Sequence, residues 1–499
     1  MARTLDAVLE HGDHRHAAIV VPGGPTLSYA QLRVEVGRAA DTLATLGLGR
    51  GDRIALVVPN SAETIVMFLA AARAGTAAPL NPAYKEDEFR FYLEDTGARA
   101  LVVTPGAGDA ARAAMPPDAL VLEAAFGGDG ALRLEATAGR SGRTRTAEPP
   151  VDDDVALVLH TSGTTSRPKQ VPLRQRNLAF SAENIARTYA LTPDDVALCV
   201  MPLFHIHGLM ASTMATFASG GTVVVPRGGF DAMTFWAAAE QFGATWYSAV
   251  PTMHQMLLTR NRSGRPAGAR ALRFIRSSSS ALSPEVMRRL ESSFGAPVVE
   301  AYGMTEASHQ MASNPLPPGE RKPGTVGRET GIRVGVMDDE GRLLAAGERG
   351  EVVIQGASVI DAYANNPEAN AKSFTGGWFR TGDQGVLDAA GYLSLIGRLK
   401  EMINRGGEKI APREIDDVLL QHPAVAEAVA FGLPHSAWGE EVAAAVVLRG
   451  DASEKDIVAF ARARLADYKV PRKLFIVERI PRTATGKIQR RAVAEAFNR

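Results

Sequence analysis

The chain has 499 residues, of which 45% are hydrophobic and 22% charged, with 55 Lys and Arg balanced by 55 Asp and Glu. That length suggests about two to four domains, and the composition is that of a globular protein rather than a disordered one. Zero net charge provides no overall field to attract nucleic acid or an anionic membrane, and the single cysteine, Cys199, excludes an internal disulfide framework and a multi-cysteine metal site.

No segment of the sequence has the character of a membrane span or a targeting signal. The longest apolar run, residues 65–72, is far shorter than the roughly eighteen residues that a span requires. The N-terminal residues lack the apolar core of a signal peptide, and the C-terminal residues match neither a prenylation nor a peroxisomal signal. We expect a cytoplasmic protein without a membrane span. We also expect no nucleic-acid partner, because no basic, aromatic-interleaved patch is present.

The first part of the chain alternates helical and strand patterns. Residues 29–46 have apolar side chains at helical spacing, and residues 53–59 form a short β-branched run typical of a buried strand. Asn60 and Glu63 then resemble a capping box at the start of a helix that Gly75 ends. The alternation predicts α/β layers on largely parallel sheets, with further strands at 99–104, 155–160, 222–226 and 298–300.

Two changes in composition divide the chain. Residues 105–150 include a stretch rich in Gly, Ala, Arg and Thr with weak periodicity, which we expect to be an exposed connector. After residues 397–401 the chain has the pattern of a compact α+β unit, with helices at 412–421 and 454–465, strands at 424–432, 441–449 and 474–477, and a loop at 481–487. We predict a large N-terminal domain of layered β-sheets and helices at 1–397, a hinge at 398–400 and a small mobile domain at 401–499.

The segment HTSGTTSRPKQVP, residues 160–172, follows the strand pattern at 155–159 and precedes a helical pattern at 177–189. Hydroxyl groups surround one glycine here, and a lysine follows; the residues are Thr161, Ser162, Gly163, Thr164, Thr165 and Lys169. Hydroxyls and the amides of a glycine-containing turn can hold phosphate oxygens, and a lysine adds a point charge. The spacing differs from that of a Walker loop. Taken alone, such a segment is more often a polar surface loop.

Four further motifs follow in order: YGMTE at 302–306, TGD at 381–383, GR at 397–398 and PRTATGK at 481–487. With the hydroxyl-rich segment, this set resembles the adenylate-forming superfamily of acyl-CoA synthetases, luciferases and peptide-synthetase adenylation domains. The resemblance extends from about residue 26 to about residue 494. It implies an ATP-dependent acid–thiol ligase that forms an acyl-adenylate and then transfers the acyl group to coenzyme A. ATP, Mg²⁺ and coenzyme A are the implied cofactor and co-substrates.

The resemblance also implies roles around ATP. The segment from Thr161 to Lys169 would hold the β- and γ-phosphates. Thr305 would hydrogen-bond the α-phosphate, and Glu306 would hold Mg²⁺, a hard cation that prefers oxygen ligands. Tyr302 would stack on adenine.

Three later residues complete the implied nucleotide site. Asp383 would accept from the ribose hydroxyls with support from Arg398, and Lys487 would bridge the attacking carboxylate and the α-phosphate. Singly, Asp383 is equally compatible with a turn, Arg398 with a surface charge and Lys487 with a solvated tail. Similar enzymes swing the small domain about one residue, here Lys400. That motion would withdraw Lys487 and bring the loop with Gly406 and Gly407 to the coenzyme A tunnel, where glycines permit close backbone approach.

Two positions in these motifs differ from those of many relatives, and one lysine resembles a residue that is modified in some of them. Many relatives have glycine where this chain has Ser166 and Gln170, and either residue could stiffen the segment and slow adenylation. Lys487 resembles a lysine that some relatives acetylate, and acetylation would remove its charge and stop the first step.

The acyl pocket is expected to be short and polar. Ser278, Ser279 and Ser280 stand where relatives with apolar substrates have Gly and Ala, and His205 and His309 lie in neighbouring motifs. Such a pocket suits a second charged group on the substrate, and protonated His309 or His205 could pair with it. The combination of HTSGTTSRPK, MTEASH and INRGGEKIAP resembles oxalate–CoA ligases. The plain structural alternative is a helix-capping serine turn beside a core histidine.

Other functions remain open at this point. The substrate could be another short or medium acid, such as malonate, a hydroxy acid or a fatty acid. A stand-alone adenylation enzyme could load a carrier protein in trans; the chain ends soon after Lys487, so we expect no carrier domain in cis. A luciferase-like enzyme would need a large aromatic pocket, and a pure ATP-binding protein would not need Lys487. A serine hydrolase lacks its G-x-S-x-G motif, and His205 and His207 lack further zinc ligands nearby.

Overall fold

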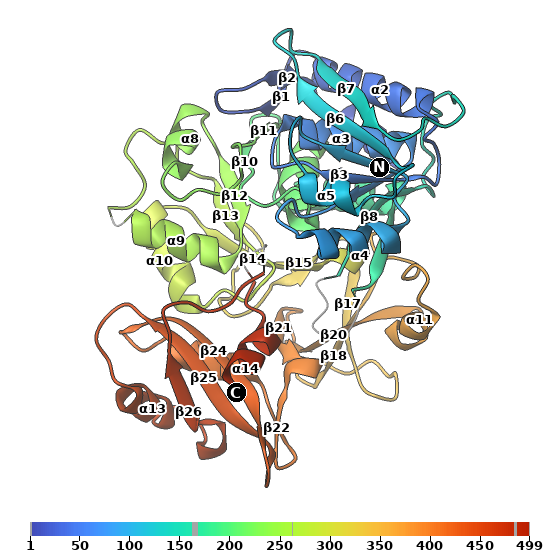
Figure 1. Ribbon diagram of the computed structural model, residues 1–499. Helices are drawn as coiled ribbons and strands as arrows, with labels where there is room; N and C mark the ends of the chain where they lie inside the picture. The colour runs from blue at the N-terminus through green and yellow to red at the C-terminus, as the bar shows by residue number, and fades with distance from the viewer. Residues whose placement is uncertain (1, 162–167, 262, 484–486, 499) are drawn as a thin grey trace.

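A computed structural model describes residues 2–161, 168–261, 263–483 and 487–498. The N-terminal and middle parts of the chain form a large body of sheets and helices, and the C-terminal part forms a smaller unit beside it (Figure 1). No helix among the described residues is long and apolar enough to cross a membrane. The α/β fold class is confirmed, with a small α+β unit at the C-terminus. The domain boundaries at 397 and 401 stay a prediction.

A nine-stranded sheet forms one wall of the large body, in the order β16-β15-β14-β13-β12-β10-β11-β1-β2. The pairs from β14 to β1 are parallel, and the strands at both edges are antiparallel. The strands are β1 (Ala17–Val20), β2 (Thr26–Ser28), β10 (Val196–Leu198), β11 (Thr222–Val224), β12 (Trp246–Ala249), β13 (Phe274–Ser277), β14 (Val298–Met304), β15 (His309–Ser313) and β16 (Arg328–Glu329).

A seven-stranded sheet forms the second wall, in the order β7-β6-β5-β3-β4-β8-β9, with antiparallel pairs only at its two ends. Its strands are β3 (Arg53–Val57), β4 (Thr76–Pro79), β5 (Ala100–Val103), β6 (Leu120–Phe126), β7 (Leu132–Ala138), β8 (Val155–His160) and β9 (Gln170–Arg174). The predicted parallel arrangement is confirmed in both sheets, because parallel strands covered on both faces have the short apolar runs seen in the sequence.

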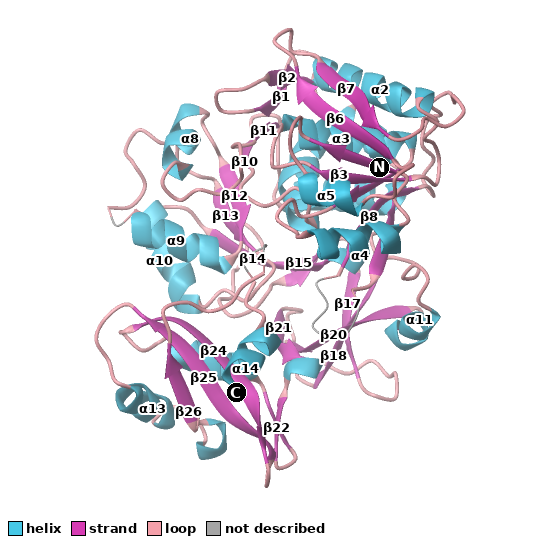
Figure 2. Cartoon of the chain, in the orientation of Figure 1, coloured by secondary structure: helices cyan, strands magenta, loops and turns pink. Residues whose placement is uncertain are grey.

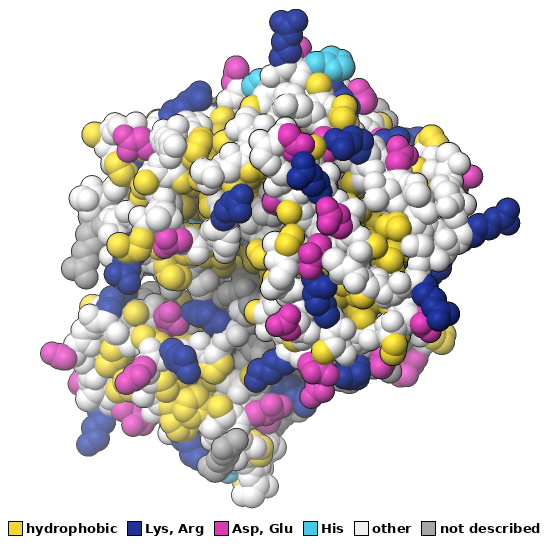
Figure 3. All heavy atoms as spheres, turned by 45° about the horizontal axis from the view of Figure 1, so that its top comes forward, with side chains coloured by type: hydrophobic (Ala, Val, Ile, Leu, Met, Phe, Trp, Pro, Cys, Tyr) yellow, Lys and Arg dark blue, Asp and Glu magenta, His cyan; other side chains and the backbone are white. Residues whose placement is uncertain are grey.

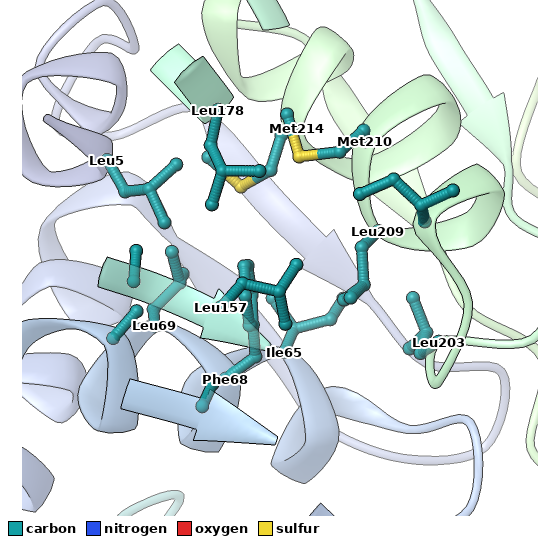
Figure 4. Close-up of a cluster of buried hydrophobic side chains, with 14 of the residues drawn as sticks. Leu5, Ile65, Phe68, Leu69, Leu157, Leu178, Leu203, Leu209, Met210 and Met214 are labelled. Atoms are coloured by element: carbon teal, nitrogen blue, oxygen red, sulfur yellow. The ribbon is translucent and has the colours of Figure 1, made fainter. Parts of the chain in front are cut away.

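Helices cover both sheets, as Figure 2 shows. In chain order they are α1 (Leu5–Leu9), α2 (Tyr29–Thr45), α3 (Ala62–Ala74), α4 (Glu86–Thr96), α5 (Asp109–Ala114), α6 (Gln175–Thr188), the π-helix η1 (His207–Met214), α7 (Ala215–Ala218), α8 (Phe235–Gln241), α9 (Pro251–Arg260) and α10 (Pro284–Phe294). The core between the two walls is drawn in Figure 4, where apolar side chains from α1, α3, β8, α6 and η1 meet.

Two local expectations were wrong, and one strand was not predicted. The expected connector, the Gly-, Ala-, Arg- and Thr-rich stretch at 127–150, contains β7, which pairs antiparallel with β6, so this stretch gains its order from the edge of the sheet. The cap of α3 is Ser61, whose hydroxyl accepts from the Thr64 amide, rather than Asn60. The end of the hydroxyl-rich segment belongs to β9, because Gln170 pairs with His160 at the end of β8.

A five-stranded antiparallel sheet follows the two large ones, with strands β17 (Arg333–Met337), β18 (Arg349–Gln355), β19 (Phe374–Thr375), β20 (Trp378–Leu387) and β21 (Leu393–Arg398). Helix α11 (Pro367–Ser373) precedes β19. The short turns η2 (Thr305–Ala307) and η3 (Leu399–Glu401) follow β14 and β21.

The C-terminal unit has its own five-stranded sheet and its own apolar core. Its strands are β22 (Ile403–Arg405), β23 (Glu408–Ile410), β24 (Val425–His435), β25 (Gly439–Leu448) and β26 (Lys473–Ile476), and its helices are α12 (Pro412–Leu419), α13 (Glu454–Arg462), η4 (Asp467–Lys469) and α14 (Arg490–Phe497). On the face drawn in Figure 3, positive and negative side chains are interspersed, as zero net charge leads one to expect.

Candidate active site

A cavity of about 640 Å³ lies where the C-terminal unit faces the large body. Its lining comes from distant parts of the sequence: residues after β13 and on β14, the facing strands β20 and β21, and the segment before α14. Several predicted site residues share this lining, namely Ser279, Ser280, Tyr302, Asp383, Arg398 and Lys487. The fold therefore brings together motifs that are separated by about two hundred residues.

Tyr302, Asp383 and Arg398 form one hydrogen-bonded group in the cavity wall. Asp383 on β20 is paired directly with Arg398 on β21, and Arg398 Nε lies 3.2 Å from Asp383 Oδ1. The Tyr302 hydroxyl donates to the other carboxylate oxygen of Asp383. Burial and the neighbouring Asp383 raise the pKa of Tyr302 well above its usual value, so the phenol stays a neutral donor.

Lys487 reaches this group from the C-terminal unit. Its amide donates to Thr483 Oγ1 at 3.1 Å, and its carbonyl accepts from the Thr483 amide at 2.8 Å, so two hydrogen bonds hold the lysine against Thr483. Burial and the nearby Arg398 lower the pKa of Lys487 to about 8, while Asp383 and Glu306 oppose that shift. The ammonium group is therefore charged at neutral pH and lies among the predicted nucleotide-binding residues.

Glu306 lies in η2 with only 6% of its surface exposed. One of its carboxylate oxygens accepts from the Tyr363 hydroxyl at 2.7 Å, and Lys169 Nζ lies 4.3 Å from the centre of the Tyr363 ring. Burial lowers the pKa of Lys169, Glu306 opposes this shift, and Lys400 adds to it. Lys400 in η3 thus lies close enough to the phosphate segment for its charge to act there.

The described residues contain no cluster of three or more His, Cys, Asp or Glu side chains that would form a complete metal cage. A single carboxylate nonetheless fits Mg²⁺, which keeps several waters and is commonly bound by one or two carboxylates together with substrate phosphates. The oxygen of Glu306 that Tyr363 does not contact is suited to this role. Thr305 precedes Glu306 in the same turn and is partly exposed.

The two ends of the hydroxyl-rich segment are joined to each other. The Thr161 amide donates to the Lys169 carbonyl at 3.0 Å, and the Lys169 amide donates to Thr161 Oγ1 at 3.2 Å. Lys169 therefore lies beside Thr161, at the opposite end of the segment. The roles predicted for Ser162, Gly163, Thr164, Thr165 and Ser166 concern residues outside the described part of the chain.

Arg276, in the middle of β13, has no exposed surface. Its Nε donates to the Tyr189 hydroxyl at 3.0 Å, its Nη1 to Ser248 Oγ at 3.0 Å and its Nη2 to Gln310 Oε1 at 3.1 Å. All three acceptors are uncharged. Within the described part of the chain, no carboxylate lies within ion-pair distance of this guanidinium. Because a buried charge is normally paired, Arg276 is an uncompensated cation next to the cavity.

Two histidines extend this group toward the cavity. Arg276 Nη1 lies 3.4 Å from His207 Nε2, and Nη2 lies 3.4 Å from His309 Nδ1. His207 Nε2 also lies 2.6 Å from Ser248 Oγ, the hydroxyl that accepts from Arg276 Nη1. His207 Nδ1 lies 3.0 Å from Ser279 Oγ, so the ring links Arg276 to a hydroxyl that lines the cavity.

This arrangement corrects the expectation that protonated histidines supply positive charge. Burial lowers the pKa of His205 to about 3, with Lys487 adding to the effect. Burial and the adjacent Arg276 likewise hold the pKa values of His207 and His309 well below the usual range. The histidines are neutral near pH 7, and the fixed positive charge belongs to Arg276 and Lys487.

The three predicted pocket serines differ in position. Ser278 is fully buried, and its hydroxyl donates to the Ala301 carbonyl at 2.8 Å, so it joins two strands rather than facing the cavity. Ser279 and Ser280 line the cavity. The expectation that all three serines fill the acyl pocket was therefore wrong for Ser278, because its hydroxyl is taken up by the Ala301 carbonyl of β14.

Backbone strain positions His309. Ser308 and His309 both have positive φ, 51° and 103°, which is uncommon for residues with a side chain. The turn is held from both sides, since Ser181 Oγ donates to the Ser308 carbonyl at 2.6 Å and Ser308 Oγ donates to the Ser358 carbonyl at 2.9 Å. A Cβ at Gly303 would lie 2.8 Å from His309 Nδ1, so glycine at 303 leaves room for the ring.

The glycines predicted for the coenzyme A tunnel lie elsewhere. Gly406 and Gly407 form the turn between β22 and β23 with φ of 60° and 91°, and they are not part of the cavity lining. The Gly406 amide donates to the Trp438 carbonyl at 2.7 Å, and a Cβ at 406 would collide with the Trp438 ring. In this conformation Lys487 is in the cavity and the glycine turn is outside it.

Sequence reasoning missed Arg276, His207 and Tyr363 as site residues. An arginine inside the apolar strand pattern Phe274–Ser277 was a usable signal, because a buried charge requires a partner or a function. Tyr363 carried no such signal, since its contact with Glu306 depends on how two distant segments fold together.

Comparison with known proteins gives consistent matches. A sequence model described as AMP-binding enzyme matches residues 7–364, and one described as AMP-binding enzyme C-terminal domain matches residues 414–487. The chain is similar to a probable CoA ligase, CCL9, of Humulus lupulus, with 48% identity covering 98% of this chain and 95% of that protein. It is also similar to an oxalate–CoA ligase of Arabidopsis thaliana, with 46% identity covering 99% of this chain and 98% of that protein. A crystal structure of ATP-bound MatB from Rhodopseudomonas palustris matches with a TM-score of 0.88 and 31% identity, covering 100% of this chain and 99% of that one.

Proposed function

The chain belongs to the AMP-binding enzyme family and is an ATP-dependent carboxylate–CoA ligase of that family, and we propose that its carboxylate substrate is oxalate. The reaction converts oxalate, ATP and coenzyme A into oxalyl-CoA, AMP and diphosphate. The similarity to an oxalate–CoA ligase supports this choice of acid.

The single observation that carries the substrate proposal is the unpaired guanidinium of Arg276. Oxalate has two joined carboxylates, so when one of them reacts at the phosphate the other remains an anion inside the protein. Arg276 supplies a compensating charge, and through His207 it is linked to the Ser279 hydroxyl at the cavity wall. A monocarboxylic acid with an apolar tail would gain no attraction from this buried cation.

A longer dicarboxylate, such as malonate, would also satisfy Arg276. We favour oxalate because Arg276, His207 and His309 form one compact polar group on β13, η1 and β15. This group reaches the cavity wall through Ser279. A compact group of this kind suits a short diacid, whose two carboxylates are joined directly.

We propose that the first step, adenylation, takes place in the conformation in which Lys487 lines the cavity. An oxygen of the substrate carboxylate attacks the α-phosphorus of ATP, an acyl-phosphate bond forms, and diphosphate leaves. We propose that Lys487 lies between the two reacting anions and reduces their repulsion, while Tyr302, Asp383 and Arg398 hold the nucleoside. Thr305 and the segment from Thr161 to Lys169 hold the phosphates, and Glu306 would hold the Mg²⁺ that neutralises phosphate charge. Positioning and charge stabilisation account for catalysis without a protein nucleophile.

The second step requires a different arrangement. The sulfur of coenzyme A attacks the acyl carbon, a thioester bond forms, and AMP leaves with the electron pair of the broken bond. Gly406 and Gly407 lie outside the cavity in the present conformation, so we propose rotation of the C-terminal unit about Lys400 before thioester formation. That rotation withdraws Lys487 and moves the glycine turn toward the thiol entrance. We propose the cytoplasm as the site of reaction and free coenzyme A, rather than a carrier protein, as the acceptor.

The test is thioester formation followed by mass spectrometry. Purified protein receives ATP, Mg²⁺ and coenzyme A with oxalate, malonate, acetate, a medium-chain fatty acid or a cinnamate-type acid in parallel, and Lys487→Ala is the control. Oxalyl-CoA as the main product, absent with Lys487→Ala, is the expected result. A main product from another acid would refute the oxalate assignment, and AMP formation without any thioester would indicate a different acceptor.

A further inference from the structure

One carboxylate outside the cavity contacts both ends of the phosphate segment. Asp95, near the end of α4, accepts from His160 Nε2 at 3.0 Å and from Gln170 Nε2 at 2.8 Å, both at its Oδ2. Gln170 Nε2 also donates to the Asp95 backbone carbonyl. His160 is the last residue of β8 and Gln170 the first of β9, and the two are direct partners in the antiparallel ladder.

This contact is buried rather than a surface coincidence. Only 6% of the His160 side chain and 19% of the Asp95 side chain are exposed, and Gln170 is 5% exposed. The Tyr92 ring packs edge-on against the His160 ring with centroids 4.8 Å apart, which fixes the imidazole from the side. Burial lowers the pKa of His160, so near neutral pH the imidazole is neutral and donates through Nε2 to the carboxylate.

The group formed by Asp95, His160 and Gln170 is also linked to Glu306, the carboxylate proposed to hold Mg²⁺. The Gln170 carbonyl accepts from the Ala364 amide at 3.1 Å, and the preceding residue, Tyr363, donates to Glu306 and lies under the Lys169 ammonium. Lys169 immediately precedes Gln170. A shift of Gln170 would therefore move both the lysine and the segment that carries Tyr363.

We propose that Asp95 is a positioning residue for ATP, because it holds His160 and Gln170 together and thereby fixes the two ends of the phosphate-binding segment against α4. The last pair of a β-ladder is where strand ends separate first, and the carboxylate closes that end with side-chain hydrogen bonds. Asp95 does not line the cavity. Its effect reaches ATP through the position of Lys169. The assignment rests on the proposed ATP-dependent function.

The experiment measures MgATP binding by calorimetry without any carboxylic acid, and then the KM values for ATP, oxalate and coenzyme A. Asp95→Ala is expected to weaken MgATP binding and raise the KM for ATP about tenfold, which corresponds to about 1.4 kcal/mol. The KM values for oxalate and coenzyme A should stay within about twofold, because the clamp does not reach their sites. Asp95→Asn should lie closer to the wild type, since its amide oxygen still accepts one hydrogen bond. Glu94→Gln, an exposed neighbour on the same helix, is the matched control.

A second variant separates positioning from folding. Gln170→Met keeps the length of the side chain and the Asp95–His160 contact but removes the donor, so it should raise the KM for ATP in the same direction by a smaller factor. The double variant Asp95→Ala/Gln170→Met should resemble Asp95→Ala alone, because both changes break one linkage. Unchanged MgATP affinity in Asp95→Ala and Gln170→Met, or additive effects in the double variant, would overturn the inference. A wild-type protein that binds no MgATP would instead overturn the proposed function together with it.

Discussion

Replacement of Arg276 by methionine tests the substrate assignment most directly. The change removes the buried charge and the donors to Tyr189, Ser248 and Gln310 while keeping a long apolar side chain in β13. The path from the guanidinium to the cavity runs through His207, with 3.4 Å from Arg276 Nη1 to His207 Nε2 and 3.0 Å from His207 Nδ1 to Ser279 Oγ. Along this path a substrate carboxylate that accepts from Ser279 lies about 11 Å from the charge, and at an effective dielectric constant of about 20 the attraction is about 1.5 kcal/mol.

This magnitude sets the expected kinetics. A loss of about 1.5 kcal/mol corresponds to a fall of about tenfold in kcat/KM for oxalate. Acetate lacks the second carboxylate, so its kcat/KM should change by less than about threefold. The assay is thioester formation with each acid over a range of concentrations. Arg288→Met, at an exposed position on α10, is the matched control and should leave both values unchanged.

Arg276→Met also leads to a second, independent prediction about how the oxalate activity depends on pH. Arg276 contributes to the lowered pKa of both His207 and His309, so its removal should raise those pKa values toward the usual range. The histidines would then protonate more readily as pH falls, and part of the oxalate activity of Arg276→Met should return at lower pH. Equal losses for oxalate and acetate, or an unchanged kcat/KM for oxalate in a folded variant, would refute the role of Arg276.

Three further changes test other parts of the site. The pKa of Lys487 is lowered to about 8, so its positive charge is lost as pH rises through that value. Single-turnover adenylation should therefore slow above about pH 8, and Lys487→Ala should remove this pH dependence along with most of the rate. An unchanged pH profile in the alanine variant would contradict the role of Lys487. Burial raises the pKa of Glu300 to about 7 in the folded protein, above its value in the unfolded chain. The unfolded chain therefore releases this proton at lower pH, and the folded state loses stability as pH rises from the pKa of the unfolded chain toward 7. Glu300→Gln keeps the acceptor for the Leu282 amide and should raise the unfolding free energy at about pH 8 by an amount on the order of 2 kcal/mol, with little effect at about pH 4, as measured by urea unfolding. Gly303→Ala places a Cβ against the His309 carbonyl and ring and should lower kcat/KM for oxalate more than the affinity for MgATP; equal losses in both would show a general disruption.

The sequence patterns were informative where local chemistry decides structure. Helix α2 and strands β3 and β5 lie within a residue or two of their predicted ranges, because helical periodicity and short β-branched runs report burial directly. The antiparallel edge strands β7 and β9 escaped prediction. Their sequences are polar or irregular, and they are ordered by pairing with β6 and β8 rather than by their own apolar pattern.

Within the candidate site, the motifs named the nucleotide residues but not their interactions. Tyr302, Asp383 and Lys487 stood out in the sequence as parts of ordered motifs, and the structure brings all three to one cavity. The neutral state of His309 could not be foreseen, because its low pKa depends on burial and on Arg276, a residue of another strand. The inward position of Ser278 depended in the same way on the neighbouring strand β14.

The sequence by itself determined the α/β class, the family resemblance and the chemistry of the reaction, because ordered motifs of hydroxyl, acidic and basic residues are local and survive without knowledge of the fold. Only the tertiary structure shows which buried charge lies next to the cavity and which residues contact both ends of the segment from Thr161 to Lys169. Arg276 is the proposed anion-binding group because packing buries it beyond the reach of any described carboxylate, and Asp95 contacts both ends of the segment from a helix more than sixty residues away in the chain. Burial and long-range proximity set these properties, and neither is encoded in any short stretch of residues.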